Sequence, residues 1–445
     1  MRRSLLPAAF LALVAALAIG VSACGDDTDD GGGGEAAAVQ PLGAGCGEVE
    51  YEGDGEPQAL IASDLPMQGD SKERSEQMVE SIRLALERSD WSAGDIAVGL
   101  QACDDSIAKT GLWDGRQCRD NAEAYADNPA LLGVVGTYNS GCAAVIIPIL
   151  SEAEDGPVSM VSPGNTFLCL TETSATCAGG EPDSYYPSGD RNYARVIPNN
   201  AFQGAALAEL ANDEGDGTAF VLYAAADDTS LGQATNFRGA AEDLGVEIAG
   251  YETWDPKAPD YRDLMKEVER SGAGAVVLAG LTEQNAGRLI QDKVDVVGPN
   301  DEVALIGFDG LTQQSTIDEA NGAAEGMFAS IPGRAPENLT GAGAEFVDEL
   351  SGRIGAAQIE QFAPFAGEAA EVLLQAIESA GDDRAAVASE VIGIERDDGL
   401  LDSYEITESG DPSVGPITVF KAGESFEPDR EITPDASTVE AARGS

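Results

Sequence analysis

Three short polar stretches follow apolar runs and carry side chains that could bind a small charged molecule. Ser140 follows the apolar run 131–136 and opens a segment whose apolar residues indicate a helix. Thr166, close to Gly164, follows the next apolar run, and Asp309 follows another far along the chain. A hydroxyl and the free backbone N–H groups of a first helical turn can hold a carboxylate, and Asp309 can pair with an ammonium group. The alternatives are an ordinary helix cap at Ser140 and a turn or cap at Asp309.

The elements that position these side chains follow a strand-and-helix alternation. Strands are expected at 59–63, 96–102, 131–136, 158–162, 193–197, 218–224, 246–252, 273–280, 303–308 and 326–332, and further ones at 391–394, 403–407 and 416–420. The segments between them repeat apolar residues with a helical period. This alternation predicts an α/β fold whose parallel sheets are covered by helices on both faces. Ligands of such sheets bind at the carboxyl ends of the strands, where the three stretches lie.

The pattern breaks once, which divides the strands between two doubly wound lobes. Residues 171–192 show no periodicity, and the alternation starts again at about residue 195. The expected parts are a lipoprotein signal peptide at 1–23, a flexible anchor linker at 24–45, lobe 1 at 46–197 plus 333–410, lobe 2 at 198–332 plus 411–427, and a polar tail at 428–445.

The N-terminus has the pattern of an export signal. Arg2 and Arg3 precede an apolar stretch at 5–21, and Cys24 follows a serine and an alanine. This arrangement resembles the bacterial lipobox, which implies that Cys24 is lipidated and that the protein is anchored to the membrane outside the cytoplasm. The alternative is an uncleaved membrane-spanning helix.

The composition excludes several classes of function. The chain has 79 acidic and 25 basic residues, a net charge of −54, so it should repel nucleic acid and anionic membrane surfaces. It has no histidine, which excludes Ser-His-Asp and Cys-His catalysis and histidine-ligated metals. We therefore expect no metal and no cofactor. Hydrolysis by paired carboxylates survives this exclusion, but no spacing of acidic residues favours it.

Apart from Cys24, an even number of cysteines remains, which favours disulfides in an exported protein. They are Cys46, Cys103, Cys118, Cys142, Cys169 and Cys177. Sequence alone leaves the pairing open. We expect Cys169 with Cys177, which closes a short polar loop, then Cys103 with Cys118, which leaves Cys46 with Cys142. Free buried thiols are the alternative, and a four-cysteine zinc site lacks the usual CxxC spacing.

Five motifs in order over residues 58–425 resemble those of the branched-chain amino acid (Leu/Ile/Val)-binding proteins, which are solute receptors of ABC importers. The motifs are GVVGTYNSGCAAVIIPIL, MVSPGNT, RVIPNNAFQGAALAEL, LIGFDG and FAPFAGEAAEVLLQAI. The resemblance implies the type I periplasmic-binding fold, with two lobes joined by a hinge of three crossings. It places the ligand's α-carboxylate on Ser140 and on Thr166 with Gly164, and its α-ammonium on Asp309. Asn165 is implied as a neighbouring contact.

The sequence departs from the family at two aromatic positions. Leu231 and Leu281 stand where the family often has tyrosines, so the ligand site should be more apolar, or should accept another amino or amide compound. Met67 and Gln68, in the loop after the first strand, are expected to form a further wall.

These features together predict an extracytoplasmic receptor that captures an amino acid or related small solute by hinge closure. Its partners would be the ligand, an ABC permease with its ATPases, and the membrane through the lipid anchor. The alternatives are a sensor of the same fold that signals to a separate partner, a receptor for a small amide, and an enzyme such as a glycosidase.

Overall fold

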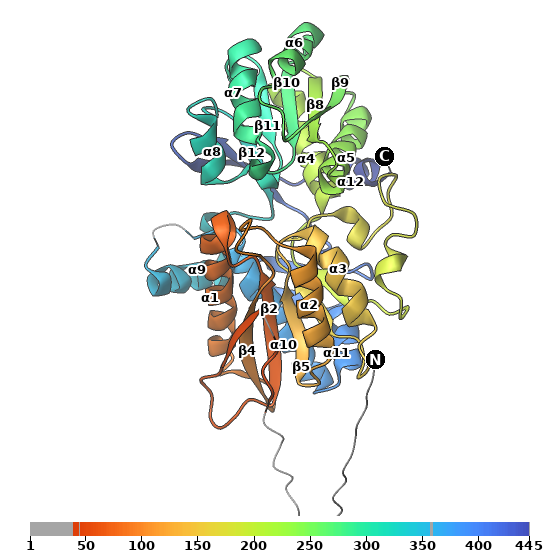
Figure 1. Ribbon diagram of the computed structural model, residues 1–445, viewed down its shortest axis with the longest axis vertical. Helices are drawn as coiled ribbons and strands as arrows, with labels where there is room; N and C mark the ends of the chain where they lie inside the picture. The colour runs from red at the N-terminus through yellow and green to blue at the C-terminus, as the bar shows by residue number, and fades with distance from the viewer. Residues whose placement is uncertain (1–38, 44, 357–358, 445) are drawn as a thin grey trace, which may run out of the picture. The chain divides into compact units, whose positions relative to one another are not determined.

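The computed structural model describes residues 39–43, 45–356 and 359–444 and contains two seven-stranded sheets, each flanked by helices (Figure 1). The expected signal peptide, Cys24 and most of the expected linker lie outside the described residues. Among the described residues, no helix has the length and apolar character that crossing a membrane would require.

The first sheet has the strand order β1-β4-β2-β5-β6-β7, and β3 pairs with β4 at its side. Its strands are β1 (Cys46–Glu50), β2 (Ala59–Leu65), β3 (Ser92–Ala93), β4 (Ile96–Asp104), β5 (Leu131–Gly136), β6 (Ser159–Ser162) and β7 (Tyr193–Arg195). The strands from β4 to β7 along this order run parallel, whereas β1 and β3 pair antiparallel with β4. Each parallel strand therefore ends at the same edge of the sheet.

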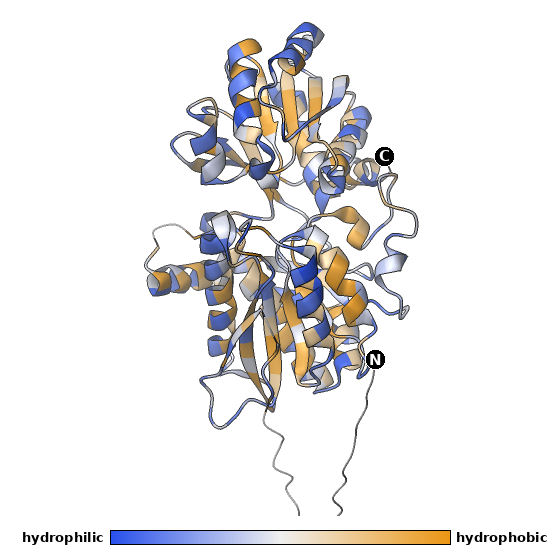
Figure 2. Ribbon diagram, viewed as in Figure 1, coloured by the Kyte–Doolittle hydropathy of each residue, from blue (hydrophilic) through white to orange (hydrophobic). Residues whose placement is uncertain are grey.

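Helices cover both faces of the first sheet. They are α1 (Lys72–Arg88), α2 (Gly115–Ala126), α3 (Ser140–Ser151), α9 (Gly341–Ile354), α10 (Ala363–Ala380) and α11 (Arg384–Val391). Ile61 packs in the cluster that contains the apolar residues of α1 and α10, whereas its neighbour Leu60 packs with those of α2 and α3. Adjacent strand residues point to opposite faces, so a strand that is buried on both faces reads as a continuous apolar run. Figure 2 shows apolar residues along these strands, polar residues over much of α1 and α2, and a largely apolar α3.

The second sheet has the order β16-β15-β12-β11-β10-β8-β9. Its strands are β8 (Thr218–Ala224), β9 (Glu247–Trp254), β10 (Ala275–Ala279), β11 (Ala304–Gly307), β12 (Phe328–Pro332), β15 (Ile417–Ala422) and β16 (Phe426–Ile432). Strands β8 to β12 are parallel to one another, and β15 and β16 add an antiparallel edge. Its helices are α4 (Asn200–Glu214), α5 (Asp228–Leu244), α6 (Arg262–Ser271), α7 (Ala286–Val296), α8 (Gln314–Ala320) and α12 (Ala436–Arg443).

The chain passes from the elements of one sheet to those of the other three times: between β7 and α4, after β12, and before β15. A separate hairpin of β13 (Glu395–Gly399) and β14 (Asp402–Glu405) precedes the last passage. Short 3-10 helices occur at η1 (Gly69–Ser71), η2 (Leu168–Leu170), η3 (Asp183–Tyr185), η4 (Thr282–Gln284), η5 (Asp309–Leu311) and η6 (Pro336–Asn338). The expected α/β fold with two doubly wound parallel sheets is confirmed.

Two expectations near the C-terminus are wrong. Residues 391–394 are not a strand, because α11 continues to Val391 and the next strand starts at Glu395. Residues 428–444 are not a loose polar tail, because they complete β16 and form α12. Val439 is buried among the apolar residues of α4 and α5, so a short apolar face fixes this segment despite its polar composition.

The cysteines form three disulfides, of which the sequence predicted one. Cys169 bonds to Cys177, as expected. The other two expected pairings are wrong, because the bonds are Cys46–Cys103 and Cys118–Cys142. Cys46 lies directly opposite Cys103 in the β1–β4 pair, and β1 was not predicted from the sequence. Cys118 and Cys142 belong to α2 and α3, which pack side by side.

Candidate functional site

The first two polar stretches meet at the carboxyl ends of β5 and β6. Ser162 is the last residue of β6. Its hydroxyl donates to the Thr137 carbonyl at 2.9 Å and accepts a hydrogen bond from the Asn165 N–H at 2.8 Å. Ser140 is the first residue of α3, and its Oγ accepts the Phe167 N–H at 3.3 Å, so it does not cap its own helix. The two stretches therefore form one polar corner at the end of the first sheet.

The backbone around Thr166 is fixed by its neighbours. Arg195 Nη1 donates to the carbonyls on either side of it, Asn165 at 2.9 Å and Phe167 at 3.0 Å, and the Thr166 carbonyl accepts the Asn200 N–H at 2.8 Å. Among the described residues, no group forms a hydrogen bond with the Thr166 hydroxyl. The backbone of Thr166 is therefore held in place, and its hydroxyl can form a hydrogen bond with a ligand.

Asn165 and Gly164 support the corner. The buried Asn165 amide donates to the carbonyls of Thr137 at 2.9 Å and Tyr138 at 3.1 Å, and its Oδ1 accepts the Tyr193 hydroxyl at 3.1 Å. This leaves the Asn165 amide little capacity for a ligand, so its role is to hold the two stretches together. A Cβ at Gly164 would lie 2.9 Å from Tyr138 Cδ2, which explains the glycine.

Asp309 lies at the carboxyl end of β11 in the second sheet and opens η5. Its half-buried carboxylate accepts a hydrogen bond from Gln233 Nε2 at 2.9 Å. Burial raises the pKa of Asp309 to about 6, and its own backbone N–H, Arg74 and the Gln203 and Gln233 side chains lower it by smaller amounts. The adjacent Gly310 allows close packing, since a Cβ there would lie 2.6 Å from the Gly280 carbonyl oxygen.

Leu231 and Leu281 lie at neighbouring strand ends of the second sheet. Leu231 is in the first turn of α5, and Leu281 precedes η4. Gln284 joins the two positions: its Oε1 accepts the Leu281 N–H at 2.7 Å, and its Nε2 donates to the α5 cap Asp227 at 2.6 Å. Both leucines are half-buried.

The loop after β2 is attached to the first sheet. Asp104 accepts the Met67 N–H at 2.9 Å and the Gln68 Nε2 at 2.7 Å, and Gln68 also donates to the Ser106 carbonyl at 3.2 Å. Met67 packs against the adjacent apolar core. The Gln68 amide therefore forms hydrogen bonds within the protein. This loop contributes to the shape of the site and offers few hydrogen bonds to a ligand.

Elements of the two sheets approach each other around these residues. A Cβ at Gly232, in α5, would lie 3.3 Å from the ring of Phe167, next to Thr166. Burial raises the pKa of Tyr138 to about 12, while Arg74 lowers it and Asp309 raises it by smaller amounts. Asp309 of the second sheet therefore lies within electrostatic range of Tyr138 and Arg74 of the first. Tyr138 therefore lies near both the polar corner and Asp309.

A cavity of about 870 Å³ lies beside Arg74, and Ser140, Thr166 and Asp309 are not among the residues that line it. One wall comes from the start of α1 and residues 359–361, and the other from residues 312–315 and 425–426. Arg74 belongs to its wall. The sequence analysis missed Arg74, although a signal was present: it lies four residues before Met78 on the buried face of α1.

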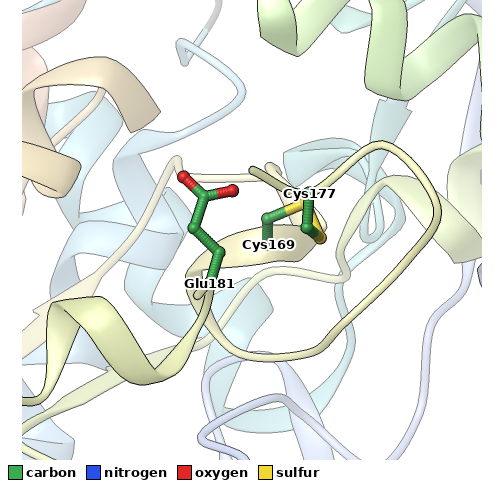
Figure 3. Close-up of side chains that lie close together, drawn as sticks. All are labelled: Cys169, Cys177 and Glu181. Carbon is green, nitrogen blue, oxygen red and sulfur yellow. A yellow bond between two sulfur atoms is a disulfide. The ribbon is translucent and has the colours of Figure 1, made fainter. Parts of the chain in front are cut away.

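One group of possible metal ligands occurs among the described residues: Cys169, Cys177 and Glu181 (Figure 3). The two sulfur atoms are bonded to each other, so neither is available as a thiolate. Glu181 accepts hydrogen bonds from the Ala178 N–H at 2.7 Å and from the Tyr185 hydroxyl. This group is a stabilised loop and does not have the chemistry of a metal centre.

Comparisons with solved structures agree with this fold. A leucine-binding protein from Thermotoga maritima is 21% identical with a TM-score of 0.70, over 84% of this chain and 99% of that one. A branched-chain amino acid transporter substrate-binding protein from Streptococcus pneumoniae, solved with isoleucine, is 15% identical with a TM-score of 0.68, over 84% and 99%. A solute-binding protein from R. palustris, solved with 4-hydroxybenzoate, is 13% identical with a TM-score of 0.68, over 84% and 97%.

These identities show a shared fold. A search of curated proteins finds no match to this chain. The family model for periplasmic binding proteins matches residues 65–425, most of the chain, which includes the polar corner and most strands of both sheets. The chain therefore belongs to the periplasmic binding protein family.

Proposed function

We propose that this protein is the solute receptor of an ABC importer and that it captures an amino acid or a related small solute between its two sheets. The Ser140 and Thr166 hydroxyls bind the ligand's carboxylate beside Gly164, whose own N–H donates to Ser162 Oγ at 3.1 Å. Asp309 binds the ammonium group from the opposite side. Because each end of the ligand is held by a different half of the protein, only the closed form satisfies both, and binding drives closure.

The observation that supports this proposal best is the placement of Asp309. Its carboxylate lies in the second sheet's half, yet it acts electrostatically on Tyr138, which adjoins Gly164 in the polar corner of the first. A half-buried carboxylate with a raised pKa lacks a strong cationic partner, and a ligand ammonium would supply one.

Calorimetry on Asp309→Ala tests the assignment. Removing the carboxylate would leave the bound ammonium buried and unpaired, which costs about 3–5 kcal/mol. Affinity should then fall by roughly a hundredfold or more. An amino acid that binds the variant and the wild type equally well would contradict the proposal.

A second ligand class has support from one relative. The R. palustris protein was solved with 4-hydroxybenzoate, a carboxylate without an ammonium group. Leu231 and Leu281 would provide this chain with an apolar wall for such a molecule. A thermal-shift screen of amino acids, small amides and aromatic carboxylates separates these classes, since a ligand at about a hundred times its Kd stabilises by about 2.7 kcal/mol.

The proposal includes the setting of the receptor. Cys24 carries the lipid anchor. The partners are an ABC permease and the ATPases that drive it. Mass spectrometry of the mature N-terminus checks the anchor. Neighbouring genes for a permease and ATPases separate import from the alternative role of a sensor, and we expect no catalytic turnover.

A further inference from the structure

Arg74 is held rigidly beside the proposed binding region. It lies in the first turn of α1, and its side chain is 10% exposed. Its Nη1 donates to the Tyr138 hydroxyl at 2.6 Å. The guanidinium carbon lies 4.9 Å from the centre of the Tyr138 ring and 5.5 Å from that of Phe362. Aromatic contacts of this kind fix the plane of an arginine and leave its edge free to bind.

Two neighbouring donors at this position have capacity left. A guanidinium has five N–H groups, and among the described residues none accepts a hydrogen bond from Arg74 Nη2. The Tyr138 oxygen accepts from Arg74, while no described residue accepts the phenol's own proton. The phenol is protonated at neutral pH, as an ordinary tyrosine is, and burial raises its pKa further, to about 12. A charged N–H edge beside a neutral O–H donor matches the two oxygens of a carboxylate.

These donors are separated from the polar corner by the length of a tyrosine side chain. The backbone end of Tyr138 adjoins Gly164, where a Cβ would lie 3.2 Å from Tyr138 Cα. The hydroxyl end of the same residue meets Arg74. A carboxylate held by Ser140 and Thr166 therefore lies at one end of Tyr138, and Arg74 at the other end is placed to meet a second acidic group. The adjoining cavity of about 870 Å³ leaves room for one.

Among the described residues, Arg74 forms one ion pair, and the distance in that pair is long. Glu360 Oε2 lies 3.5 Å from Arg74 Nε, and the Glu360 side chain is 36% exposed. Glu283 also acts on Arg74 electrostatically. A single long contact to a partly solvated carboxylate contributes little. A ligand carboxylate would compete with these acids and would satisfy the edge that they leave open.

We propose that Arg74, with Tyr138, binds the side-chain carboxylate of an acidic amino acid, and that this receptor is therefore specific for dicarboxylic amino acids. The inference rests on the proposed function, since it assumes that Ser140, Thr166 and Asp309 hold the α-carboxylate and the α-ammonium. It differs from a branched-chain specificity in one respect: the far end of the ligand is charged.

Isothermal titration calorimetry with L-glutamate, L-aspartate, their amides L-glutamine and L-asparagine, and L-leucine tests the inference. The wild type should bind one of the acids at least about tenfold more tightly than its amide, since the pair differs in one charge-assisted contact. Arg74→Gln should abolish this preference by weakening the acid about ten- to a hundredfold and the amide by less than about threefold. Arg74→Lys should restore part of the preference, because it keeps the charge without the planar edge.

Two further variants control the experiment. Arg88→Gln removes a positive charge from the other end of the same helix, where Arg88 pairs with Glu349 at 2.8 Å and does not line the cavity, and it should leave the preference unchanged. Glu360→Gln removes the competing carboxylate and should tighten binding of the acid. Thermal unfolding of each variant shows that it is folded.

The outcomes separate this inference from the proposed function. Tight binding of leucine or of the amides, with no preference for the acids, overturns the specificity and leaves the amino acid receptor standing. An equal loss of acid and amide in Arg74→Gln shows a structural role and also overturns it. If none of the five compounds binds the folded wild type, the inference fails, and the wider thermal-shift screen of small amides and aromatic carboxylates decides whether the proposed function stands.

Discussion

At the residue scale, some polar side chains of the site form hydrogen bonds within the protein, and others have hydrogen-bonding groups left for a ligand. Asn165 and Gln68 are engaged by backbone and side-chain partners, whereas the Thr166 hydroxyl is held in place by its backbone alone. Asp309 accepts from Gln233 at 2.9 Å, and Gln203, its own backbone N–H and Arg74 also lower its pKa, but burial outweighs them. The carboxylate therefore holds its proton more tightly than an ordinary aspartate, and its charge changes near pH 6.

Asp309 therefore makes ligand affinity depend on pH. Since burial raises its pKa to about 6, the unliganded protein loses the carboxylate charge below that pH, and affinity for an ammonium ligand should fall roughly tenfold per pH unit. Calorimetry between pH 5 and 8 measures this slope. Asp309→Asn is the control, because its weaker affinity should not change over the same range.

The same shift gives the sign of its effect on stability. An ordinary aspartate loses its proton near pH 4 in the unfolded chain, whereas the folded protein keeps it to about pH 6. The Asp309 contribution to stability is therefore complete below about pH 4 and is lost as the pH rises through 6. A ligand that carries an ammonium group reverses this loss. Equal slopes for the wild type and Asp309→Asn would contradict the assignment.

At the element scale, the polar corner lies at strand ends that could be predicted from the sequence. The apolar run 131–136 and the polar residues after it predicted β5 and the start of α3 within one residue. Parallel strands end at one edge, so Ser140 and Thr166 had to lie close together. Arg74 escaped prediction because its significance comes from Tyr138 and Phe362, which are distant along the chain.

Disulfides between residues far apart along the chain could not be predicted either, because they depend on how distant elements pack. The strand β1 is short and half polar, so it gave no periodic signal, yet it places Cys46 opposite Cys103. The bond between Cys118 and Cys142 depends on the packing of α2 against α3, which local patterns do not specify. Only Cys169–Cys177, eight residues apart, could be inferred from proximity along the chain.

The disulfides should differ in their contribution to stability. Constraint of the unfolded chain grows with the length of the loop that a bond closes, so Cys46–Cys103, with a separation of 57, should contribute about 4 kcal/mol. Cys169–Cys177, with a separation of 8, should contribute about 2.5 kcal/mol. Chemical denaturation of the paired serine variants measures both. A larger loss from the short loop than from the long one would contradict this account.

At the scale of the whole molecule, three chain passages join two sheets whose strand ends supply opposite chemistry. The first sheet offers hydroxyls, backbone N–H groups and an arginine, and the second offers a carboxylate and apolar side chains. The net charge of −54 should repel anionic ligands in dilute salt. Added salt screens this repulsion, so the association rate of an acidic ligand should increase with ionic strength. The arrangement accounts for a small solute that is held from both sides.

A thermodynamic cycle tests the central claim most directly. It compares the wild type and Asp309→Asn by calorimetry, each with the bound amino acid and with the same acid lacking its ammonium group. If Asp309 holds the ammonium, either change alone should weaken binding strongly and the second should add little, a coupling of about 1–3 kcal/mol. Losses that simply add, with a coupling near zero, would show that the two groups do not meet and would contradict the account.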